Sequence, residues 1–496
     1  NIYIINNPFH YEIENLTRAF FNNEKMNVIK CDKNVNREKP FVAIELIKHE
    51  KDSDIIVSFA DEDFEKTLSK KIDGEFDSEY SECERMAAIM LFEILSEYTG
   101  IRLPWGILTG VRPIKLLHNL VRELGTDGAD KYFREKLLVT EQKTKLALTT
   151  EKNERKILEL SKPDSFSLYI SVPFCPTRCS YCSFVSQSIE KAKKLVEPYL
   201  DLLCQEIKYT AEIAKELNLR LETVYIGGGT PTTFSAEQLT KLITAINASF
   251  DMKKCREFTI EAGRPDTITR EKLEAILDGG CDRISINPQT LNDEVLEAIG
   301  RRHTATQTLE AYKLAEEIGF KHINMDLITG LPKDTPETFK YTLDTLCDLS
   351  PASITVHTLA MKRSSFLTLG GALVKTGAEP PAAIMMKYCE EKLPQFGYHP
   401  YYLYRQSRME GNLENVGWSK DGFDGLYNVY VMDETHTILA CGAGGVSKLR
   451  EPGVNHLERI FNYKYPYEYI NGFDEMLRRK EQILSLIHIS EPTRPY

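Results

Sequence analysis

The stretch SLYISVPFCPTRCSYCSF (167–184) decides how this chain is interpreted. Its first half is short and apolar, as a buried strand is, and its second half is a loop with cysteines at positions 175, 179 and 182. With 11 cysteines in 496 residues, a Cys-x3-Cys-x2-Cys pattern arises by chance in roughly one such chain in two hundred. The spacing therefore indicates a site rather than three scattered residues.

Cys175, Cys179 and Cys182 are predicted to hold an iron–sulfur cluster. Three thiolates on one short loop suit a [4Fe-4S] cubane whose fourth iron stays open for another ligand. Taken alone, the triplet also fits an iron–sulfur electron carrier. Structural zinc is a further alternative, but it wants four protein ligands, and no second pair of Cys or His follows at the spacing of a zinc finger.

Short apolar strands alternate with helices from residue 167 onward. The expected strands are 167–173, 221–228, 257–262, 283–289, 322–330 and 353–360. Ser235 and Thr269 stand where helix N-caps belong, and Gly319 and Gly397 stand where helices end. Because parallel strands need helical crossovers, six such units predict an α/β fold with a partial (β/α)6 barrel. Function is expected at the C-terminal ends of its strands.

The barrel, residues 164–397, is expected to lie between two further regions. Residues 1–163 mix apolar runs with an amphipathic helix and predict an α+β domain of unknown role. Residues 398–483, which include YYLYRQ and TILACGAGGVSK, predict a C-terminal α+β extension. Residues 484–496 (LSLIHISEPTRPY) resemble a translated sequencing adapter and are expected to be a non-native tail.

Composition limits the classes of binding partner that the protein can have and indicates where in the cell it works. A net charge of -11 argues against a general nucleic-acid surface, which needs clustered Lys and Arg. No run approaches the roughly 20 apolar residues of a membrane span, and the N-terminus lacks the pattern of a secretory signal. The other eight cysteines are scattered along the chain and are expected to be reduced, buried side chains, which predicts a cytoplasmic protein.

Several segments in register resemble the oxygen-independent coproporphyrinogen oxidases, the HemN family of radical S-adenosylmethionine (SAM) enzymes. They are YISVPFC, GGGTPT, IEAGRPD, PQT, IGRRHT and DLITGLP, which fall at the ends of the first five expected strands. The segments GVRPIKLL, YYLYRQ, GNLENVG and ITVHTLAMKRSS further resemble the HemZ branch of that family. The likeness to this branch covers nearly the whole chain.

The resemblance implies a SAM site beside the cluster. The implied cofactor contacts are Tyr169, Tyr181, Gly228, Gly229, Thr230, Glu261, Gln289, Arg301 and Asp326. The glycine turn is implied to meet the amino group of SAM, Glu261 and Asp326 its ribose or amino groups, and Arg301 a carboxylate. Two departures bear on whether a second SAM molecule binds: Ser171 stands where the family carries His, and Asn287-Pro288 where it carries Gly-Val.

The resemblance also implies a reaction, the conversion of two propionates of coproporphyrinogen III to vinyl groups, which gives protoporphyrinogen IX for haem biosynthesis. Such an enzyme needs SAM, a [4Fe-4S] cluster and an electron donor such as flavodoxin or ferredoxin. The expected anchors of the tetrapyrrole carboxylates are Lys362, Arg363 and Arg405. Three tyrosines are expected beside them, namely Tyr401, Tyr402 and Tyr404. No residue is assigned a catalytic role.

Two other activities stay open. One branch of the family carries haem without decarboxylating it, and its members have a His-Asn pair before Tyr-Trp, whereas this chain runs from Asn412 to Trp418 without a histidine. A radical SAM methyltransferase or ring-opening enzyme acting on haem is also compatible with the SAM motifs.

Overall fold

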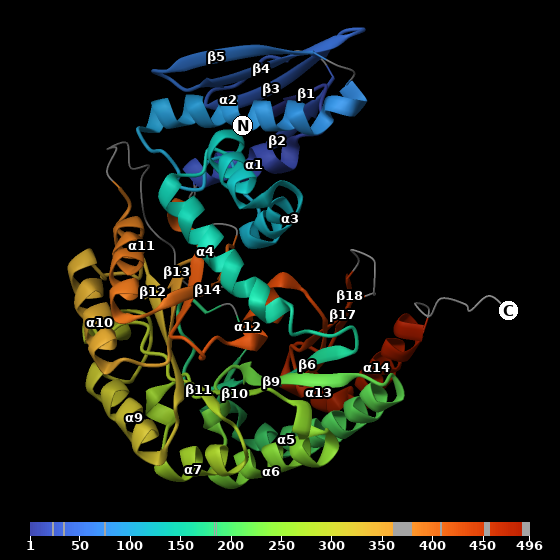
Figure 1. Ribbon diagram of the computed structural model, residues 1–496, viewed down its shortest axis with the longest axis vertical. Coiled ribbons are helices and arrows are strands. Elements are labelled where there is room, and N and C mark those ends of the chain that lie inside the picture. The colour runs from blue at the N-terminus through green and yellow to red at the C-terminus, as the bar shows by residue number, and fades with distance from the viewer. Residues whose placement is uncertain are drawn as a thin grey trace, which may run out of the picture.

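The centre of the molecule is an 11-stranded sheet that contains the six strands expected of the barrel (Figure 1). The computed structural model describes residues 1–488 apart from 22–23, 33–34, 74–75, 183, 185, 361–378, 407–408 and 451–456. The six strands are β6 (Ser165–Val172), β9 (Arg220–Gly228), β10 (Glu257–Glu261), β11 (Arg283–Ser285), β12 (His322–Thr329) and β13 (Ser353–Thr358). Neighbours pair in parallel and in chain order, which confirms the α/β fold.

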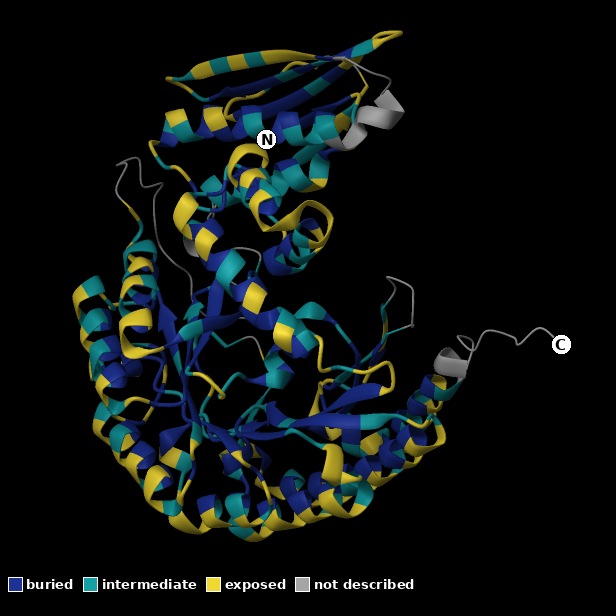
Figure 2. Cartoon of the chain, in the orientation of Figure 1, coloured by how far each residue is buried: buried dark blue, intermediate teal, exposed yellow. Residues whose placement is uncertain are grey.

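Helices connect these strands and lie as an outer arc around them (Figure 1). They are α5 (Ile189–Glu216), α6 (Ala236–Ser249), α7 (Arg270–Asp278), α8 (Asp293–Ala298), α9 (Ala305–Ile318), α10 (Pro336–Leu349) and α11 (Pro381–Lys392). The expected caps are present, because the side chains of Ser235 and Thr269 accept backbone N–H groups at the starts of α6 and α7. Figure 2 shows buried residues along the strands and exposed residues on the outward faces of the helices.

The described sheet stays open, as a partial barrel does. Residues after the barrel extend it at both edges, with β15 (Asn415–Ser419) and β14 (His399–Tyr404) beyond β13. At the other edge β16 (Thr437–Cys441) pairs in parallel with β6 and is followed by β17 (Val446–Arg450) and β18 (Leu457–Phe461). Helix α12 (Leu426–Asp433) packs against both β14 and β9, so it bridges the two halves of the open sheet.

The last helices cover one edge of this sheet. Helices α13 (Pro466–Asn471) and α14 (Phe473–His488) both pack against α5. Helix α14 continues into the first residues of the expected tail, and Leu484 packs against the hydrophobic core. In the described part of the chain no helix combines the length and apolarity that crossing a bilayer requires.

Residues 1–99 form a second sheet above the barrel, in the order β2-β1-β3-β4-β5 (Figure 1). Its strands are β1 (Ile2–Ile5), β2 (Val28–Cys31), β3 (Phe41–Lys48), β4 (Asp52–Ala60) and β5 (Glu65–Asp73). Two helices, α1 (His10–Phe20) and α2 (Phe76–Thr99), lie on the side of this sheet that faces the barrel. The mixture of strands and helices agrees with the α+β character expected of this region.

Two connecting helices, α3 (Pro113–Lys131) and α4 (Glu141–Leu158), fasten this region to the barrel. Helix α4 packs along β14, and its buried Lys143 forms ion pairs with Glu390 and Glu414. The Trp105 indole N–H donates to the same Glu414 over 2.6 Å. Since a buried charge is costly unless it is paired, these contacts hold the two parts together in one arrangement.

Candidate functional site

The cysteine loop follows the first barrel strand and turns back on itself. Strand β7 (Phe174–Cys175) pairs with β8 (Gln187–Ser188), and this pairing closes the loop that carries all three cysteines. Cys179 is buried, Cys175 and Cys182 are half-buried, and all three are free thiols. They line one cavity of about 260 Å³. Burial raises the pKa of Cys175 and of Cys182, and the neighbouring thiols raise both further.

The same cavity gathers residues from the ends of successive barrel strands. Every SAM contact implied by the sequence except Tyr169 lines it, namely Tyr181, Gly228, Gly229, Thr230, Glu261, Gln289, Arg301 and Asp326. Tyr169 points instead into the adjoining interior of the barrel, where its ring stacks against Tyr225 and Tyr427. Its hydroxyl lies close to the wall that the two cavities share, since a Cβ on Gly228 would be 3.4 Å from it. A contact between Tyr169 and SAM stays a prediction.

The glycine turn after β9 lies directly against the cysteine loop. The N–H of Gly229 donates to the Val172 carbonyl over 2.8 Å, and the N–H of Thr230 donates to the Phe174 carbonyl over 2.7 Å. A Cβ on Gly229 would lie only 2.5 Å from that Phe174 oxygen, so only glycine fits there. The hydroxyl of Thr230 also reaches the Cys175 sulfur at 3.5 Å. The turn therefore fixes the loop and leaves its backbone open to the cavity.

Two carboxylates face the cavity from β10 and β12. Glu261 accepts a 2.6 Å hydrogen bond from Tyr225, and burial raises the pKa of Glu261 to about 7. Asp326 accepts from Asn324 over 2.7 Å and lies 3.7 Å from the His357 ring nitrogen. Both carboxylates thus have one side fixed by the protein, while the cavity offers room for a ligand hydroxyl or ammonium group.

Gln289 adopts a backbone conformation that few residues other than glycine adopt. Its φ is 68°, and its N–H donates to the Asp326 carbonyl over 2.9 Å. The side-chain oxygen is buried and has no hydrogen-bond partner in the described residues. Strain together with an unpaired buried acceptor is typical of a ligand-binding position.

Arg301 is buried in the wall of the cavity, whereas Arg302 beside it is exposed and pairs with Glu190. The terminal nitrogens of Arg301 donate to the carbonyls of Asn287 and Gly263 and to the Tyr181 hydroxyl. Only its Nε is buried without a partner in the described residues. The guanidinium therefore does not present the free two-pronged face that a bidentate carboxylate contact needs.

Arg301→Lys is expected to weaken SAM binding by about 10- to 150-fold, or roughly 1.5–3 kcal/mol. A lysine ammonium cannot hold three acceptors in the plane of the guanidinium, so Tyr181 and the Asn287 carbonyl would shift. Equilibrium dialysis with SAM measures the change, and Arg302→Lys is the matched control. Weaker SAM binding in Arg302→Lys alone would assign the role to Arg302 in place of Arg301. Unchanged SAM binding in both variants would remove Arg301 from the site.

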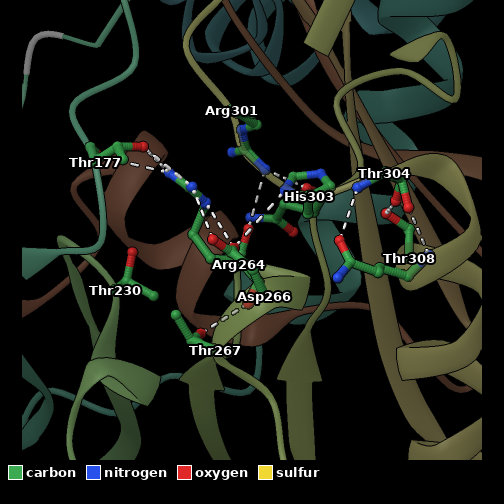
Figure 3. A network of polar contacts seen from close by, with 12 residues as sticks. Thr177, Thr230, Arg264, Asp266, Thr267, Arg301, His303, Thr304 and Thr308 are labelled. Atoms are coloured by element: carbon green, nitrogen blue, oxygen red, sulfur yellow. Dashed lines mark hydrogen bonds and ion pairs between the residues drawn. The ribbon is translucent and has the colours of Figure 1, made fainter. Parts of the chain in front are cut away.

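Arg264 is a site residue that sequence reasoning missed. It follows β10 and is buried, and its guanidinium donates to the Thr177 hydroxyl and to Asp266, each at 3.1 Å (Figure 3). One N–H also points to the Cys179 sulfur at 3.8 Å. Next to it His303 is buried, and burial followed by the charges of Arg301 and Arg264 lowers the pKa of this histidine to about 3. The signal in the sequence was a lone arginine in the GRPD turn after a barrel strand.

Arg264→Gln is expected to lower the free energy of unfolding by roughly 1.5–3 kcal/mol and to loosen the cysteine loop. The substitution leaves the side chains of Asp266 and Thr177 without their charged donor, and it removes a buried guanidinium. Urea denaturation of the full chain gives the first quantity. The exposed Arg270, which pairs with Glu317 at the surface, is the control, and Arg270→Gln is expected to cost less than about 0.5 kcal/mol. Equal losses in both variants would contradict this role of Arg264.

The expected carboxylate anchors do not line the site as a group. Lys362 and Arg363 lie outside the described residues. Arg405 is buried, and its two terminal nitrogens donate to the Leu108 carbonyl and to Asn412, so they hold the fold together; its Nε has no partner in the described residues. All three tyrosines belong to one buried cluster, but only Tyr402 and Tyr404 line the barrel interior, and Tyr401 does not.

The two departures from the family motif have structural partners. The Ser171 hydroxyl donates to the Ala443 carbonyl over 2.7 Å, which joins β6 to the end of β16. Asn287 accepts from Ser285 through its side chain and from Arg301 through its carbonyl. Further lining residues that the sequence did not single out are Thr177, His357, Gln406 and Asn415.

The residues present fit a [4Fe-4S] cluster and SAM. The three thiols do not converge as ligands of a single ion among the described residues, and a cubane spreads its ligands over separate irons. Beside them lie a glycine cradle that a Cβ would fill and two buried polar atoms that no described residue pairs with, Gln289 Oε1 and Arg301 Nε. Cys175, Cys179 and Cys182 would hold the cluster, and the strand-end residues would hold SAM.

A fold with a three-cysteine loop at the first strand end of a partial barrel defines the radical SAM class. The sequence model of the Radical SAM superfamily matches residues 169–346, and members of this superfamily use a [4Fe-4S] cluster and SAM. The oxygen-independent coproporphyrinogen-III oxidase-like protein HemZ of Bacillus subtilis is 38% identical over 82% of this chain and 82% of its own length. The chain therefore belongs to the HemZ-type, HemN-like family of radical SAM proteins, and its cofactors are a [4Fe-4S] cluster and SAM.

Two further comparisons bear on fold and function. The heme chaperone HemW of Lactococcus lactis is 30% identical over 65% of this chain and 80% of its own length. Among solved structures, coproporphyrinogen III oxidase (HemN) from Escherichia coli matches with a TM-score of 0.51 at 23% identity, over 67% of this chain and 77% of that chain. The structural match shows the fold, and the sequence relatives include both an oxidase-like protein and a haem chaperone.

Proposed function

We propose that this protein oxidatively decarboxylates two propionates of coproporphyrinogen III without oxygen and so forms protoporphyrinogen IX. The observation that carries the proposal is that two cavities share part of their walls. The cysteine-lined pocket shares Gly228, Glu261 and Asp326 with a cavity of about 540 Å³ inside the barrel, which is also lined by Tyr169, Tyr225, Tyr402, Tyr404 and Tyr427. That volume lies within the usual range of ligand sites, and aromatic walls suit a large, flat-sided substrate. The 38% identity to an oxidase-like relative supports the substrate class.

When bound, the cluster and SAM supply a 5′-deoxyadenosyl radical that can take a hydrogen atom from an unactivated carbon. In the proposed reaction the β-carbon of a propionate gives up that hydrogen atom, and the side chain then loses CO2 and one electron to become a vinyl group. The products from SAM are methionine and 5′-deoxyadenosine. An external donor such as flavodoxin or ferredoxin supplies the electron that cleaves SAM, and an external acceptor takes the electron that the substrate loses. We place the reaction in the cytoplasm.

The chain itself binds SAM, orients the propionate and excludes water. Glu261 and Asp326 are placed to accept hydrogen bonds from the ribose or ammonium groups of SAM, and Gln289 is placed to accept another. The buried walls keep water from the reacting carbon. Positioning of the propionate against the cofactor is the main contribution that this geometry makes to the rate.

The experiment is an anaerobic incubation of reconstituted protein with SAM, a reductant and coproporphyrinogen III, followed by mass analysis of the tetrapyrrole. Protoporphyrinogen IX and its monovinyl intermediate are the expected products. Cleavage of SAM alone does not count, because radical SAM enzymes can consume the cofactor without substrate turnover.

A haem carrier is the second candidate, because one of the similar relatives is named a haem chaperone. The absence of a histidine between Asn412 and Trp418 disfavours it. Stoichiometric haem binding, with coproporphyrinogen III returned unchanged under strong reductant, would favour the carrier over the oxidase.

A further inference from the structure

The charged residues that line the cavity inside the barrel include Glu257, Glu261, Arg283, Asp326 and Lys448, and two of them are committed to the fold. Glu257 at the start of β10 accepts backbone N–H groups from Leu426 and Tyr427 over 2.6 and 3.2 Å. Arg283 donates to the Phe423 carbonyl over 2.7 Å and to the Ser353 hydroxyl over 2.9 Å. These two charges therefore hold α12 and the neighbouring strands in place and are not available to a ligand.

Lys448 on β17 is different, because it lines this cavity and its ammonium group forms no hydrogen bond or ion pair with any described residue. It is half-buried, so a large part of its stem is covered. A half-buried ammonium group without a counter-ion is unfavourable, since burial weakens its hydration. The position is therefore more favourable when an anion occupies the cavity.

The surroundings of Lys448 carry an excess of positive charge. Arg112 pairs with both carboxylate oxygens of Glu434, at 2.5 and 2.6 Å, and Arg459 reaches the same carboxylate at 3.5 Å. Burial lowers the pKa of Lys448; Glu434 acts in the opposite direction, and Arg112 and Arg459 lower it further. Three cations thus share one carboxylate. Such a surplus beside a cavity attracts carboxylates or other anions.

The lining residues also indicate how a ligand would be oriented between the cysteine loop and Lys448. The cysteines line only the smaller pocket and Lys448 lines only the barrel cavity. The two spaces share the lining residues Phe184, Gly228, Glu261, Asp326, His357 and Tyr404. A ligand that spans both spaces can place one end near the cysteine loop and another against β17.

We infer that Lys448 binds a carboxylate of the tetrapyrrole, on a side chain other than the one that reacts. This inference rests on the proposed function, because it takes the occupant of the barrel to be a molecule with several propionates. It adds a cation to the anchors expected from the sequence, of which Arg405 has its terminal nitrogens committed to the fold. Lys448 is a binding residue in this account and takes no part in the chemistry.

The test is a fluorescence titration of the full-length, cluster-loaded protein with coproporphyrin III, the stable oxidised form of the substrate. Lys448→Met keeps the length of the stem and removes the charge, and it is expected to raise the Kd at least tenfold. Lys448→Arg is expected to stay within about threefold of the wild type. Lys313→Met, on the exposed face of α9, is the control for a lost surface charge and is expected to change nothing.

The tetramethyl ester of coproporphyrin III separates charge from packing. It is expected to bind the wild type and Lys448→Met equally, because it carries no carboxylate. Equal loss of both ligands in Lys448→Met, or no loss of coproporphyrin III, would overturn the inference. Turnover of coproporphyrinogen III by the wild type, with an unchanged KM in Lys448→Met, would sink this inference alone. Charge-dependent binding without any decarboxylation would retain the site and overturn the proposed oxidase.

Discussion

Cys179→Ala is expected to remove the iron–sulfur absorbance of the anaerobically reconstituted protein and to lower its iron from about four atoms per chain to less than one. Cys179 is the most deeply buried of the three loop cysteines, and Arg264 points an N–H at its sulfur. Two remaining thiolates leave half of a cubane without protein ligands. Iron and acid-labile sulfide per chain, with the visible spectrum, measure the loss.

Cys204→Ala is the matched control, because Cys204 is a half-buried cysteine on α5 that does not line the site. This variant should keep the full cluster. A complete cluster in Cys179→Ala would contradict the ligand assignment. Tight binding of zinc by the wild type, with no iron taken up, would favour the zinc site that the cysteine spacing alone left open.

Gly229→Ala is expected to weaken SAM binding by more than about 100-fold, or roughly 2.7 kcal/mol. The added Cβ would lie 2.5 Å from the Phe174 oxygen and 2.7 Å from the Val172 oxygen, and neither backbone atom can rotate away. Since Phe174 directly precedes Cys175, relief of the clash moves the glycine turn and the cysteine loop together. Equilibrium dialysis with SAM measures the affinity.

The control for this glycine is Gly110→Ala, where a Cβ would meet nothing within 4 Å. Overpacking typically costs about 1–3 kcal/mol, so urea denaturation should show lower stability for Gly229→Ala only. Normal SAM affinity in a folded Gly229→Ala protein would mean that the cofactor does not lie against this turn.

The sequence predicted the barrel well because its signals are local. Each βα unit carries its own periodicity and caps, and Ser235 and Thr269 cap the helices expected of them. The added strands β14 to β18 were harder to predict, because their positions at the two edges of the sheet depend on partners far away in the chain. The same holds for Trp105 and Glu414, which meet although 309 positions separate them.

The residues of the candidate site likewise fall into some that the sequence predicted and some that it did not. Residues at strand ends were predictable, since the ends of parallel strands meet at one edge of the sheet. Arg264 and Lys448 were not, because their importance depends on contacts that span the fold, such as the bond from Arg264 to Thr177, 87 positions earlier. Tyr169, which family resemblance assigns to SAM, lines the adjoining barrel cavity, and that cavity shares Gly228 and Glu261 with the cysteine pocket. Its contact with SAM stays a prediction.

The central claim, that the protein takes hydrogen from a propionate β-carbon, is tested most directly with coproporphyrinogen III deuterated at those carbons. Wild-type protein is incubated anaerobically with this substrate, SAM and a reductant, and the 5′-deoxyadenosine is analysed by mass spectrometry. The account predicts one deuterium in each 5′-deoxyadenosine formed during turnover, with a vinyl group formed in step. Unlabelled 5′-deoxyadenosine together with an unchanged tetrapyrrole would contradict it.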